Sequence, residues 1–431
     1  MNKETIKFIL GDFHEKPLPE AFRRGLELPL DVNKIVTLVG IRRSGKTYLL
    51  YLTMQRLIGR GIDKKNIIYI NFEDDRLFPV KLAEMDFILR AYHELYPDKL
   101  AEKKYLFLDE IQKVSDWEKY VRRIYDTESV RIYLTGSSSK TVSRDISTTL
   151  RGRAIHYEVF PLSFREYLGF KGIEAKSYST SIEARIIHAL REYLDWGGFP
   201  EVVIEEDKYL RRKTLQEYAD LILYKDLIEQ YGIKNQYLLK YLLKHFMANP
   251  ATLVSINKLY NDLKSQGLSL SKDSLYEYIE YLREAYILFH TAKYSRSVRV
   301  QTQNPSKYYI VDTGLMQSFL PDPGRDLGKK LENVLYLHLR TNQKIKEVFY
   351  YKNRFEIDFF YYAGTRLHLA NASYGVQDLD TAKREINGLL KGKKLFPDAR
   401  DALILNDWEP ELIPDNIEVI PAWRFLVSDH H

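Results

Sequence analysis

The sequence predicts an α/β fold in which a parallel β-sheet is covered by helices on both faces. Apolar strand-like stretches alternate with helical ones from Lys34 to about Arg153, and this alternation is typical of a parallel sheet. A glycine-rich loop, Gly40–Thr47, follows the first strand and fits the pattern G-x-x-x-x-G-K-[ST]. A later strand, Tyr105–Asp109, ends in two adjacent acidic residues. Together these observations predict the sheet of a P-loop nucleoside triphosphatase.

Four segments are expected to form the strands of this sheet, because each is a short run with apolar β-branched or aromatic residues. They are Lys34–Val39, Asn66–Asn71, Tyr105–Asp109 and Arg131–Thr135. Open α/β sheets keep their active groups at the carboxyl ends of the strands. The residues that follow these strands are therefore the candidates for function.

The loop after the first strand is predicted to bind phosphate. Its glycines let the backbone fold back, so that consecutive N–H groups and the N-terminus of the next helix face the β-phosphate. Lys46 can reach the β- and γ-phosphate oxygens, and the Thr47 hydroxyl can ligate Mg²⁺. The residues expected to bind the nucleotide are Gly40, Arg42, Arg43, Ser44, Gly45, Lys46, Thr47 and Tyr48.

The two acids at the end of the third strand are expected to serve the same site. Asp109 would hold the Mg²⁺ shell with Thr47, and Glu110 would polarise the attacking water. Phosphoryl transfer needs charge neutralisation and a positioned nucleophile more than covalent chemistry. An apolar run followed by two acids can also mark a strand that simply meets solvent, but the phosphate loop upstream favours the catalytic interpretation.

Two further positions are catalytic candidates. Serines follow the strand that ends at Thr135, and Ser137 could sense the γ-phosphate, although Ser138 is hard to distinguish from it and turn chemistry is the alternative. Arg153 could be an arginine finger for the nucleotide of a neighbouring subunit, because a guanidinium is planar and permanently cationic. The alternative is a surface arginine in a loop. A finger of this kind implies a homo-oligomer.

Composition limits the classes of protein that the chain could represent. At 431 residues it should hold two or three domains, and its net charge of +6 permits a nucleic-acid partner without requiring one. The absence of cysteine excludes disulfides, thiolate metal sites and cysteine nucleophiles. There is no signal-peptide pattern and no run of about 18 apolar residues, so no membrane is expected and the expected compartment is the cytoplasm.

The rest of the chain predicts three more parts. Helical patterns from Pro161 to about Tyr231, broken by a turn at Gly197–Pro200, suggest a helical lid. Between Asn249 and Val311, helices and strands follow in the order of a winged helix-turn-helix, which could contact DNA or could only pack and relay motion. Three basic residues lie where the wing would be, namely Lys293, Arg296 and Arg299. From Arg325 onward the pattern predicts a last α/β domain.

Six segments carry a resemblance to a known family. They are Val39–Leu50, Tyr105–Trp117, Leu150–Leu168, Gly197–Pro200, Tyr309–Leu315 and Glu356–Phe359. Through them the chain resembles prokaryotic AAA-type ATPases, found in archaea and bacteria, that carry a C-terminal domain of unknown function. The resemblance implies ATP as the nucleotide. The expected parts are an AAA-type P-loop ATPase core at 1–155, a helical lid at 156–235, a winged helix-turn-helix at 236–320 and a C-terminal domain at 321–431.

The C-terminal domain of this family resembles the restriction-endonuclease-like fold. In that fold a helix Glu, a strand Asp and an acid-x-Lys strand gather Mg²⁺ around a phosphate, and Glu332 and Asp358 match the first two positions. The third strand, Leu367–Ala372, offers neither the second carboxylate nor the lysine. The metal would lack a ligand and the water its activator, so the domain is expected to be an inactive, nuclease-like scaffold.

The sequence thus predicts an enzyme, a Mg²⁺-dependent ATPase whose nucleotide state moves the winged-helix and nuclease-like domains. DNA is a candidate partner. Two alternatives stay open, which are an ATP-gated nuclease and a nucleotide-switched signalling or scaffold protein that binds no nucleic acid.

Overall fold

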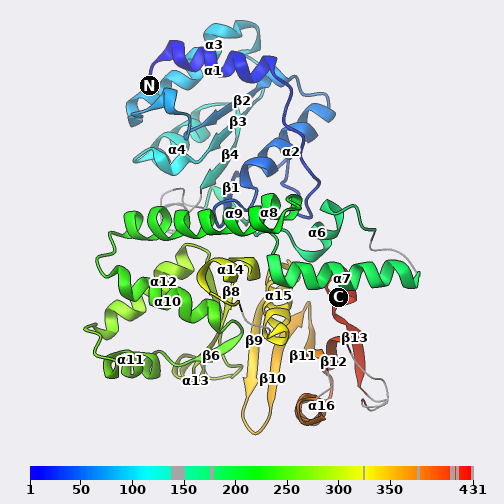
Figure 1. Ribbon diagram of the computed structural model, residues 1–431. Helices are drawn as coiled ribbons and strands as arrows, with labels where there is room; N and C mark the ends of the chain where they lie inside the picture. The colour runs from blue at the N-terminus through cyan, green and yellow to red at the C-terminus, as the bar shows by residue number, and fades with distance from the viewer. Residues whose placement is uncertain are drawn as a thin grey trace. The chain divides into compact units, whose positions relative to one another are not determined.

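The structure, a computed structural model, describes residues 1–136, 150, 152–174, 179–323, 326–375, 379–407, 413 and 417–428. The chain divides into two compact units. One consists of Met1–Phe160 with Glu284–Tyr286, and the other of Pro161–Arg283 with Ile287–His431. Figure 1 labels the helices and strands of both units. The four predicted domains are a finer division than these two units, and their boundaries stay a prediction.

A five-stranded parallel sheet forms the centre of the first unit. Its strands lie in the order β2 (Ile67–Asn71), β3 (Lys104–Asp109), β4 (Val130–Gly136), β1 (Ile35–Val39) and β5 (Ala154–Glu158). The four expected strands are present, with ends that differ by at most one residue. The fifth, β5, is not among the expected strands because only partly buried and exposed residues make it up. Since β4 lies between β1 and β3, the phosphate loop and the acidic pair lie two strands apart at one edge.

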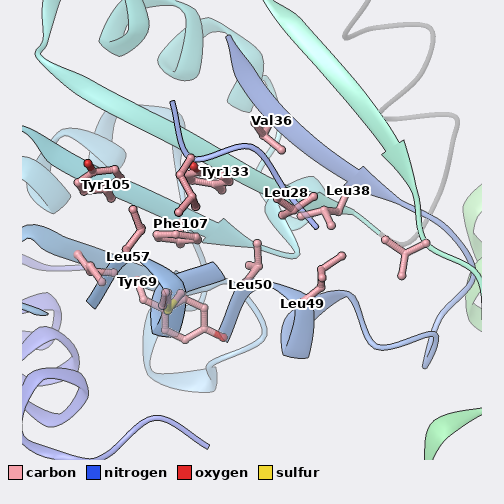
Figure 2. Packing of buried hydrophobic residues seen from close by; sticks show 14 residues of the cluster. Leu28, Val36, Leu38, Leu49, Leu50, Leu57, Tyr69, Tyr105, Phe107 and Tyr133 are labelled. Carbon is pink, nitrogen blue, oxygen red and sulfur yellow. The ribbon is translucent and has the colours of Figure 1, made fainter. Parts of the chain in front are cut away.

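Helix α2 follows the phosphate loop and packs its apolar face on the sheet. The α-helices in the described part of this unit are α1 (Lys3–Glu15), α2 (Lys46–Gly59), α3 (Asp86–Leu95) and α4 (Trp117–Thr127). Figure 2 shows the buried cluster that α2 shares with the sheet, in which the rings of Phe107 and Tyr133 stack with centroids 4.6 Å apart. Burying each such side chain contributes about 1.5–3 kcal/mol. Leu28 and Leu30 join the same cluster, so the segment before β1 is also fixed on the sheet.

The second unit begins with helices, as the sequence predicts. They are α6 (Phe164–Phe170), α7 (Thr180–Trp196), α8 (Pro200–Ile204), α9 (Lys208–Leu221), the π-helical η7 (Ile222–Glu229) and α10 (Gln236–Ala248). A capping box starts α6, because the Ser163 hydroxyl accepts from the Glu166 amide and the Glu166 carboxylate accepts from the Ser163 amide. The expected break is at Gly197, where α7 ends with a φ of +74°.

A small antiparallel sheet follows, in the order β6 (Thr252–Val254), β8 (Ser306–Ile310) and β7 (Leu288–Thr291). Its helices are α11 (Ile256–Ser265), α12 (Lys272–Glu284) and α13 (Val298–Gln303). Two short helices, η8 (Thr313–Leu315) and α14 (Met316–Phe319), come after β8. The strand β6 is not among the expected ones because it has only three residues.

The last part is a mixed five-stranded sheet in the order β13 (Glu418–Pro421), β12 (Arg400–Asp407), β11 (Arg366–Gly375), β10 (Glu356–Ala363) and β9 (Ile345–Lys352). Pairs β9–β10 and β10–β11 are antiparallel, and pairs β11–β12 and β12–β13 are parallel. The helices are α15 (Leu327–Thr341), α16 (Leu379–Leu395) and α17 (Ala422–Val427). The third strand of the expected nuclease pattern, Leu367–Ala372, lies within β11, which is ten residues long.

Candidate functional site

The backbone of the glycine-rich loop takes conformations that ordinary residues avoid. Gly40 has a φ of +146° and Gly45 a φ of +96°, which is why glycine stands at both positions. A Cβ on Gly40 would lie 2.2 Å from the Val159 carbonyl oxygen. Arg43 is also left-handed, with a φ of +66°, which costs about 1–2 kcal/mol in a residue with a side chain. Helix α2 starts at Lys46, so its first amides face the concave side of the loop.

Two side chains of the loop indicate that its ligand is an anion. Lys46 is only 4% exposed, and its Nζ donates to the carbonyl oxygens of Gly40 and Ile41 at 3.0 Å each. The Oγ of Ser44 is buried and has no hydrogen-bond partner among the described residues. A buried cation inside the loop and an unsatisfied polar atom beside it fit a phosphate group.

Asp109 lies at the end of β3, where three hydroxyl groups hold its carboxylate. The Thr47 and Tyr69 hydroxyls donate to its Oδ2 at 2.8 and 3.0 Å, and the Thr135 hydroxyl donates to its Oδ1. Asp109 is fully buried, and burial raises the pKa of its carboxyl, although these donors oppose the rise. The structure therefore brings Thr47 and Asp109 together, as the sequence predicts. Their oxygen atoms are the donors that Mg²⁺ prefers.

Glu110 is held in place by its backbone as well as by its side chain. It takes a left-handed φ of +53°, a conformation that carries strain in residues other than glycine and that gathers at functional sites. Its amide donates to the Thr135 hydroxyl at 2.8 Å, and the Gln112 side-chain amide donates to its carboxylate. Thr135 thus contacts both acids.

Tyr69 and Thr135 are absent from the sequence-based site. Each is on a strand that flanks β3, and no local motif identifies them. Their position follows from the strand order, which the sequence pattern leaves open. A threonine at the carboxyl end of an apolar strand was the available signal for Thr135.

Arg153 is not near the phosphate loop of its own chain. Its carbonyl oxygen accepts from the Ile35 amide at the amino end of β1, whereas the loop leaves the carboxyl end, about 16 Å away along a five-residue strand. Its guanidinium pairs with Asp126 at 2.9 Å. A role for Arg153 at a neighbouring subunit stays a prediction. The other candidate for catalysis, Ser137, lies outside the described residues, as does Ser138.

The remaining loop residues differ in exposure. Arg42 pairs with Glu73 at 3.2 Å, while Arg43 and Tyr48 are exposed to solvent. Arg24, before β1, is a further contact that the sequence did not indicate. Its guanidinium donates to the Ser44 carbonyl oxygen at 3.0 Å.

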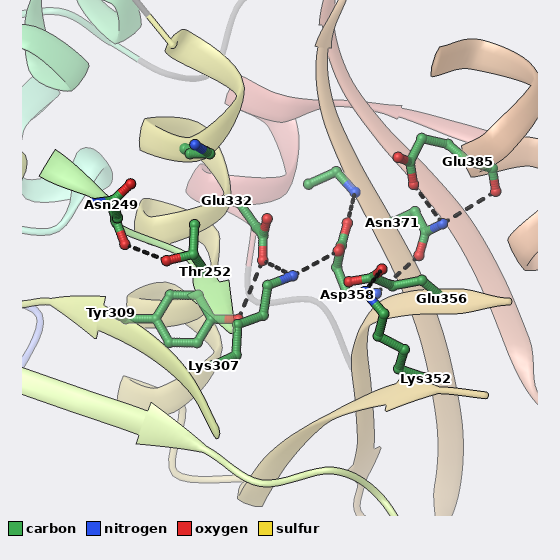
Figure 3. A network of polar contacts seen from close by, with 12 residues as sticks. Asn249, Thr252, Lys307, Tyr309, Glu332, Lys352, Glu356, Asp358, Asn371 and Glu385 are labelled. Carbon is green, nitrogen blue, oxygen red and sulfur yellow. Dashed lines mark hydrogen bonds and ion pairs between the residues drawn. The ribbon is translucent and has the colours of Figure 1, made fainter. Parts of the chain in front are cut away.

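A second polar cluster is buried where the nuclease-like site is expected (Figure 3). Lys307 of β8 places its Nζ 2.5 Å from Glu332 and 2.9 Å from Asp358. Tyr309 donates to the same Glu332 carboxylate at 3.3 Å. The ammonium of Lys307 thus lies between the two carboxylates that match the nuclease pattern.

The third strand of that pattern contributes an amide. Asn371 accepts from the Asp358 amide at 3.0 Å and donates to the Glu385 carboxylate at 2.8 Å. Among the residues that the structure describes, no group of three or more His, Asp or Glu side chains is arranged to hold a metal ion. The expectation that the domain does not cleave DNA stays a prediction.

One ammonium cannot balance two buried carboxylates, so Glu332 retains its proton. Burial, with the charge of Asp358 added, raises the pKa of Glu332 to about 8. The two acids raise the pKa of Lys307 in spite of its burial.

Comparison with known proteins defines the class. Residues 32–168 match a family described as "AAA domain", and residues 187–326 match a domain of unknown function, DUF8612. The first unit, with its parallel sheet and phosphate loop, is therefore an AAA-type P-loop nucleotide-binding domain.

The chain belongs to the family of the uncharacterized protein MJ1544 of Methanocaldococcus jannaschii. The two are 34% identical over 432 residues, which cover 97% of this chain and 94% of the relative. An uncharacterized protein of Haemophilus influenzae is 31% identical over 72% of this chain and 75% of its own length. The resemblance to archaeal and bacterial AAA-type ATPases is thus confirmed. The matched domain of unknown function ends at residue 326, ahead of the mixed five-stranded sheet, which neither family match covers.

Solved structures show more distant likenesses. The Aeropyrum pernix ORC1 protein in complex with DNA is 14% identical with a TM-score of 0.31, over 75% of this chain and 93% of that one. AMPPCP-bound DnaA from Aquifex aeolicus is 14% identical with a TM-score of 0.26, over 65% and 86%. Scores this low carry no argument about function.

Within the described ranges, none of the helices combines the length and the apolar character needed to cross a bilayer.

Replacing Lys307 with Met should destabilise the second unit by about 3–5 kcal/mol, because it leaves the buried carboxylate of Asp358 without its cation. Lys352 offers a matched control, since it pairs with Glu356 at 2.7 Å on the surface. Lys352→Met should cost less than about 1 kcal/mol. Urea unfolding followed by tyrosine and tryptophan fluorescence measures both. If the two variants lower the free energy of unfolding equally, the buried ammonium contributes no more to stability than the exposed one.

The stability of the second unit should depend on pH through Glu332. The pKa of Glu332 is about 8 in the folded chain, against the ordinary value of 4.5 in the unfolded chain. Between these two pH values the folded state therefore binds a proton that the unfolded state has released. The free energy of unfolding should therefore fall as the pH rises from about 5 to about 8. In Glu332→Gln, which keeps an acceptor for Lys307, this part of the fall should disappear. Unfolding curves measured across that pH range test the expectation, and an unchanged slope in the variant contradicts it.

Proposed function

We propose that the protein is a Mg²⁺-dependent ATPase whose nucleotide state repositions its second unit. The observation that carries the proposal is the hydrogen bond between Thr47 of the phosphate loop and the buried Asp109 carboxylate. It joins the residue types that bind phosphate and metal in one place at the carboxyl edge of a parallel sheet.

The residues of the chain divide the chemistry among them. Lys46 exchanges the carbonyl oxygens of its own loop for the β- and γ-phosphate oxygens of ATP, since a charge-assisted contact to phosphate is the stronger. Thr47 and Asp109 would hold Mg²⁺, which supplies neutralisation of the phosphate charge when bound. Glu110, fixed by Thr135 and Gln112, accepts a hydrogen bond from the attacking water and orients it. The other loop residues, Gly40, Arg42, Arg43, Ser44, Gly45 and Tyr48, surround the nucleotide.

Arg153 remains the proposed arginine finger. Its position at the amino edge of β5 keeps it away from the nucleotide of its own chain, so it can act only on a second copy. The proposal therefore includes a homo-oligomer.

DNA is the proposed partner of the small antiparallel sheet and its helices. The order α10, β6, α11, α12, β7 and β8 supports a winged helix-turn-helix. Lys272 and Tyr276 are exposed on α12, and Arg296 and Arg299 are exposed between β7 and β8. Cations with an exposed aromatic ring suit a phosphate backbone.

The first test uses two substitutions with different effects. Lys46→Ala should remove nucleotide binding, because it deletes the buried cation of the loop. Glu110→Gln should keep binding but lower kcat by about 100-fold or more, because it removes the group that orients water. Calorimetric titration with ATP and a phosphate-release assay measure the two quantities. ATP turnover by Glu110→Gln at the wild-type rate would remove Glu110 from the mechanism.

The second test concerns DNA. ATP turnover should rise when duplex DNA is added, and a gel shift should weaken steeply as salt rises, because binding releases counterions from phosphates. Arg299→Glu should weaken binding, whereas Arg366→Glu, at an exposed site on β11, should not. If neither turnover nor mobility responds to DNA at low salt, the protein is a nucleotide-switched scaffold without this partner. Cleavage of the DNA that is lost in Asp358→Ala would instead establish the gated nuclease.

A further inference from the structure

Just before the chain passes from the first unit to the second, between Phe160 and Pro161, Val159 lies against the phosphate loop. The pairing of β1 with β5 continues one residue past the end of β5, since the Val159 amide donates to the Val39 carbonyl oxygen at 2.7 Å. Val39 is the last residue before Gly40. The Val159 side chain is buried in the core cluster of α2 and the sheet. The end of β5 is therefore fixed to the start of the phosphate loop.

Two further contacts tighten this connection. Gly40 lies so close to Val159 that a Cβ would meet the Val159 carbonyl oxygen at 2.2 Å. Arg24 bridges the two segments, because one of its terminal nitrogens donates to the Ser44 carbonyl oxygen and the other to the Phe160 carbonyl oxygen, both at 3.0 Å. The planar guanidinium fixes both acceptors in one geometry. Any shift of Ser44 therefore changes the contact at Phe160.

Immediately after the chain enters the second unit, Leu162 makes two backbone hydrogen bonds. The Leu162 amide donates to the Gly198 carbonyl oxygen at 2.7 Å, and the Leu162 carbonyl oxygen accepts from the Tyr193 hydroxyl at 2.7 Å. Gly198 has no room for a side chain, since a Cβ would lie 2.3 Å from the Leu162 carbonyl oxygen. The turn between α7 and α8 is therefore held closely against Leu162.

The same turn is also hydrogen-bonded to Asp312, which follows β8. The Asp312 carboxylate accepts from the Gly198 amide at 2.6 Å and from the Gly314 amide at 2.8 Å. Asp312 follows the strand that carries Lys307, the cation between Glu332 and Asp358. Hydrogen bonds and an ion pair therefore link Leu162, through the turn and β8, to Asp358 in the mixed sheet.

We propose that the Val159–Leu162 segment, which we call the junction, transmits the state of the phosphate loop to the second unit, with Arg24 as the positioning residue that ties the loop to it. The inference rests on the proposed function, and it names the path by which that function works. Nucleotide binding draws Lys46 away from the Gly40 carbonyl oxygen and reorders the loop at the point where Gly40 touches Val159. Packed backbones switch between arrangements rather than deform gradually, so the junction moves with the loop.

The experiment measures the distance between the units in the full chain. The protein has no cysteine, so Lys119→Cys in α4 and Lys346→Cys in β9 give one unique pair of exposed positions for a donor and an acceptor dye. Energy transfer is recorded with Mg²⁺–AMPPNP and with ADP, and the affinity for each nucleotide is measured on the same samples. The variants are Arg24→Ala, Arg24→Lys and Arg23→Ala. Arg23 is the matched control, because its side chain is 90% exposed and pairs with Glu27 at the surface.

We expect AMPPNP to change the energy transfer in the wild type and equally in Arg23→Ala. In Arg24→Ala most of this change should be lost, while the affinity for AMPPNP should fall by less than about tenfold. Arg24→Lys, which can reach one carbonyl oxygen at a time, should lose the change in part, and it serves as the readout if the alanine variant does not fold.

Two outcomes overturn the inference. Arg24→Ala, or the lysine variant in its place, could show the full wild-type change with AMPPNP bound, or it could lose AMPPNP binding together with the change, in which case Arg24 only shapes the loop. Failure of the proposed function itself looks different. In that case the wild type binds AMPPNP and its energy transfer does not change.

Discussion

The buried carboxylate of Asp109 is the point on which the first unit depends. It accepts hydrogen bonds from a residue of β2, a residue of β4 and the phosphate loop, so three separate segments meet on one side chain. An isolated buried carboxylate would be very costly, and these hydroxyls make it tolerable. The same donors keep its oxygen atoms at the place where a metal ion and a triphosphate would require them. The same hydrogen bonds therefore stabilise the first unit and hold Asp109 in position for the ligand.

How much the sequence predicts differs between local and distant features. The loop Gly40–Thr47 and the strand that ends at Asp109 were identifiable because each is a contiguous pattern with its own physical reason. Tyr69 and Thr135 were not identifiable, because they reach Asp109 only through a strand order in which β4 lies between β1 and β3. The strand β5 was not predicted because its side chains are only partly buried or exposed. The predicted role of Ser137 falls outside the described residues.

The cluster around Lys307 shows the same limit in the second unit. The third strand has neither a carboxylate nor a lysine, and its Asn371 bonds instead to the Asp358 amide and the Glu385 carboxylate. The sequence does not indicate that a lysine arrives from β8, about 50 residues before Asp358. A buried pair of this kind contributes little net stability relative to apolar residues. It links β8 to α15 and β10.

The order of the parallel strands also has a consequence for synthesis. Strand β1 emerges early from the ribosome, but both of its partners, β4 and β5, follow roughly 90 to 120 residues later. At the usual rate of translation, about 5–20 residues per second, β1 remains without either neighbour for about 5 to 19 s. During that time an apolar strand has both edges free, which makes a nascent chain prone to mispairing. The parallel sheet can be completed only when β5 has been made, and β5 ends just before the chain enters the second unit at Pro161.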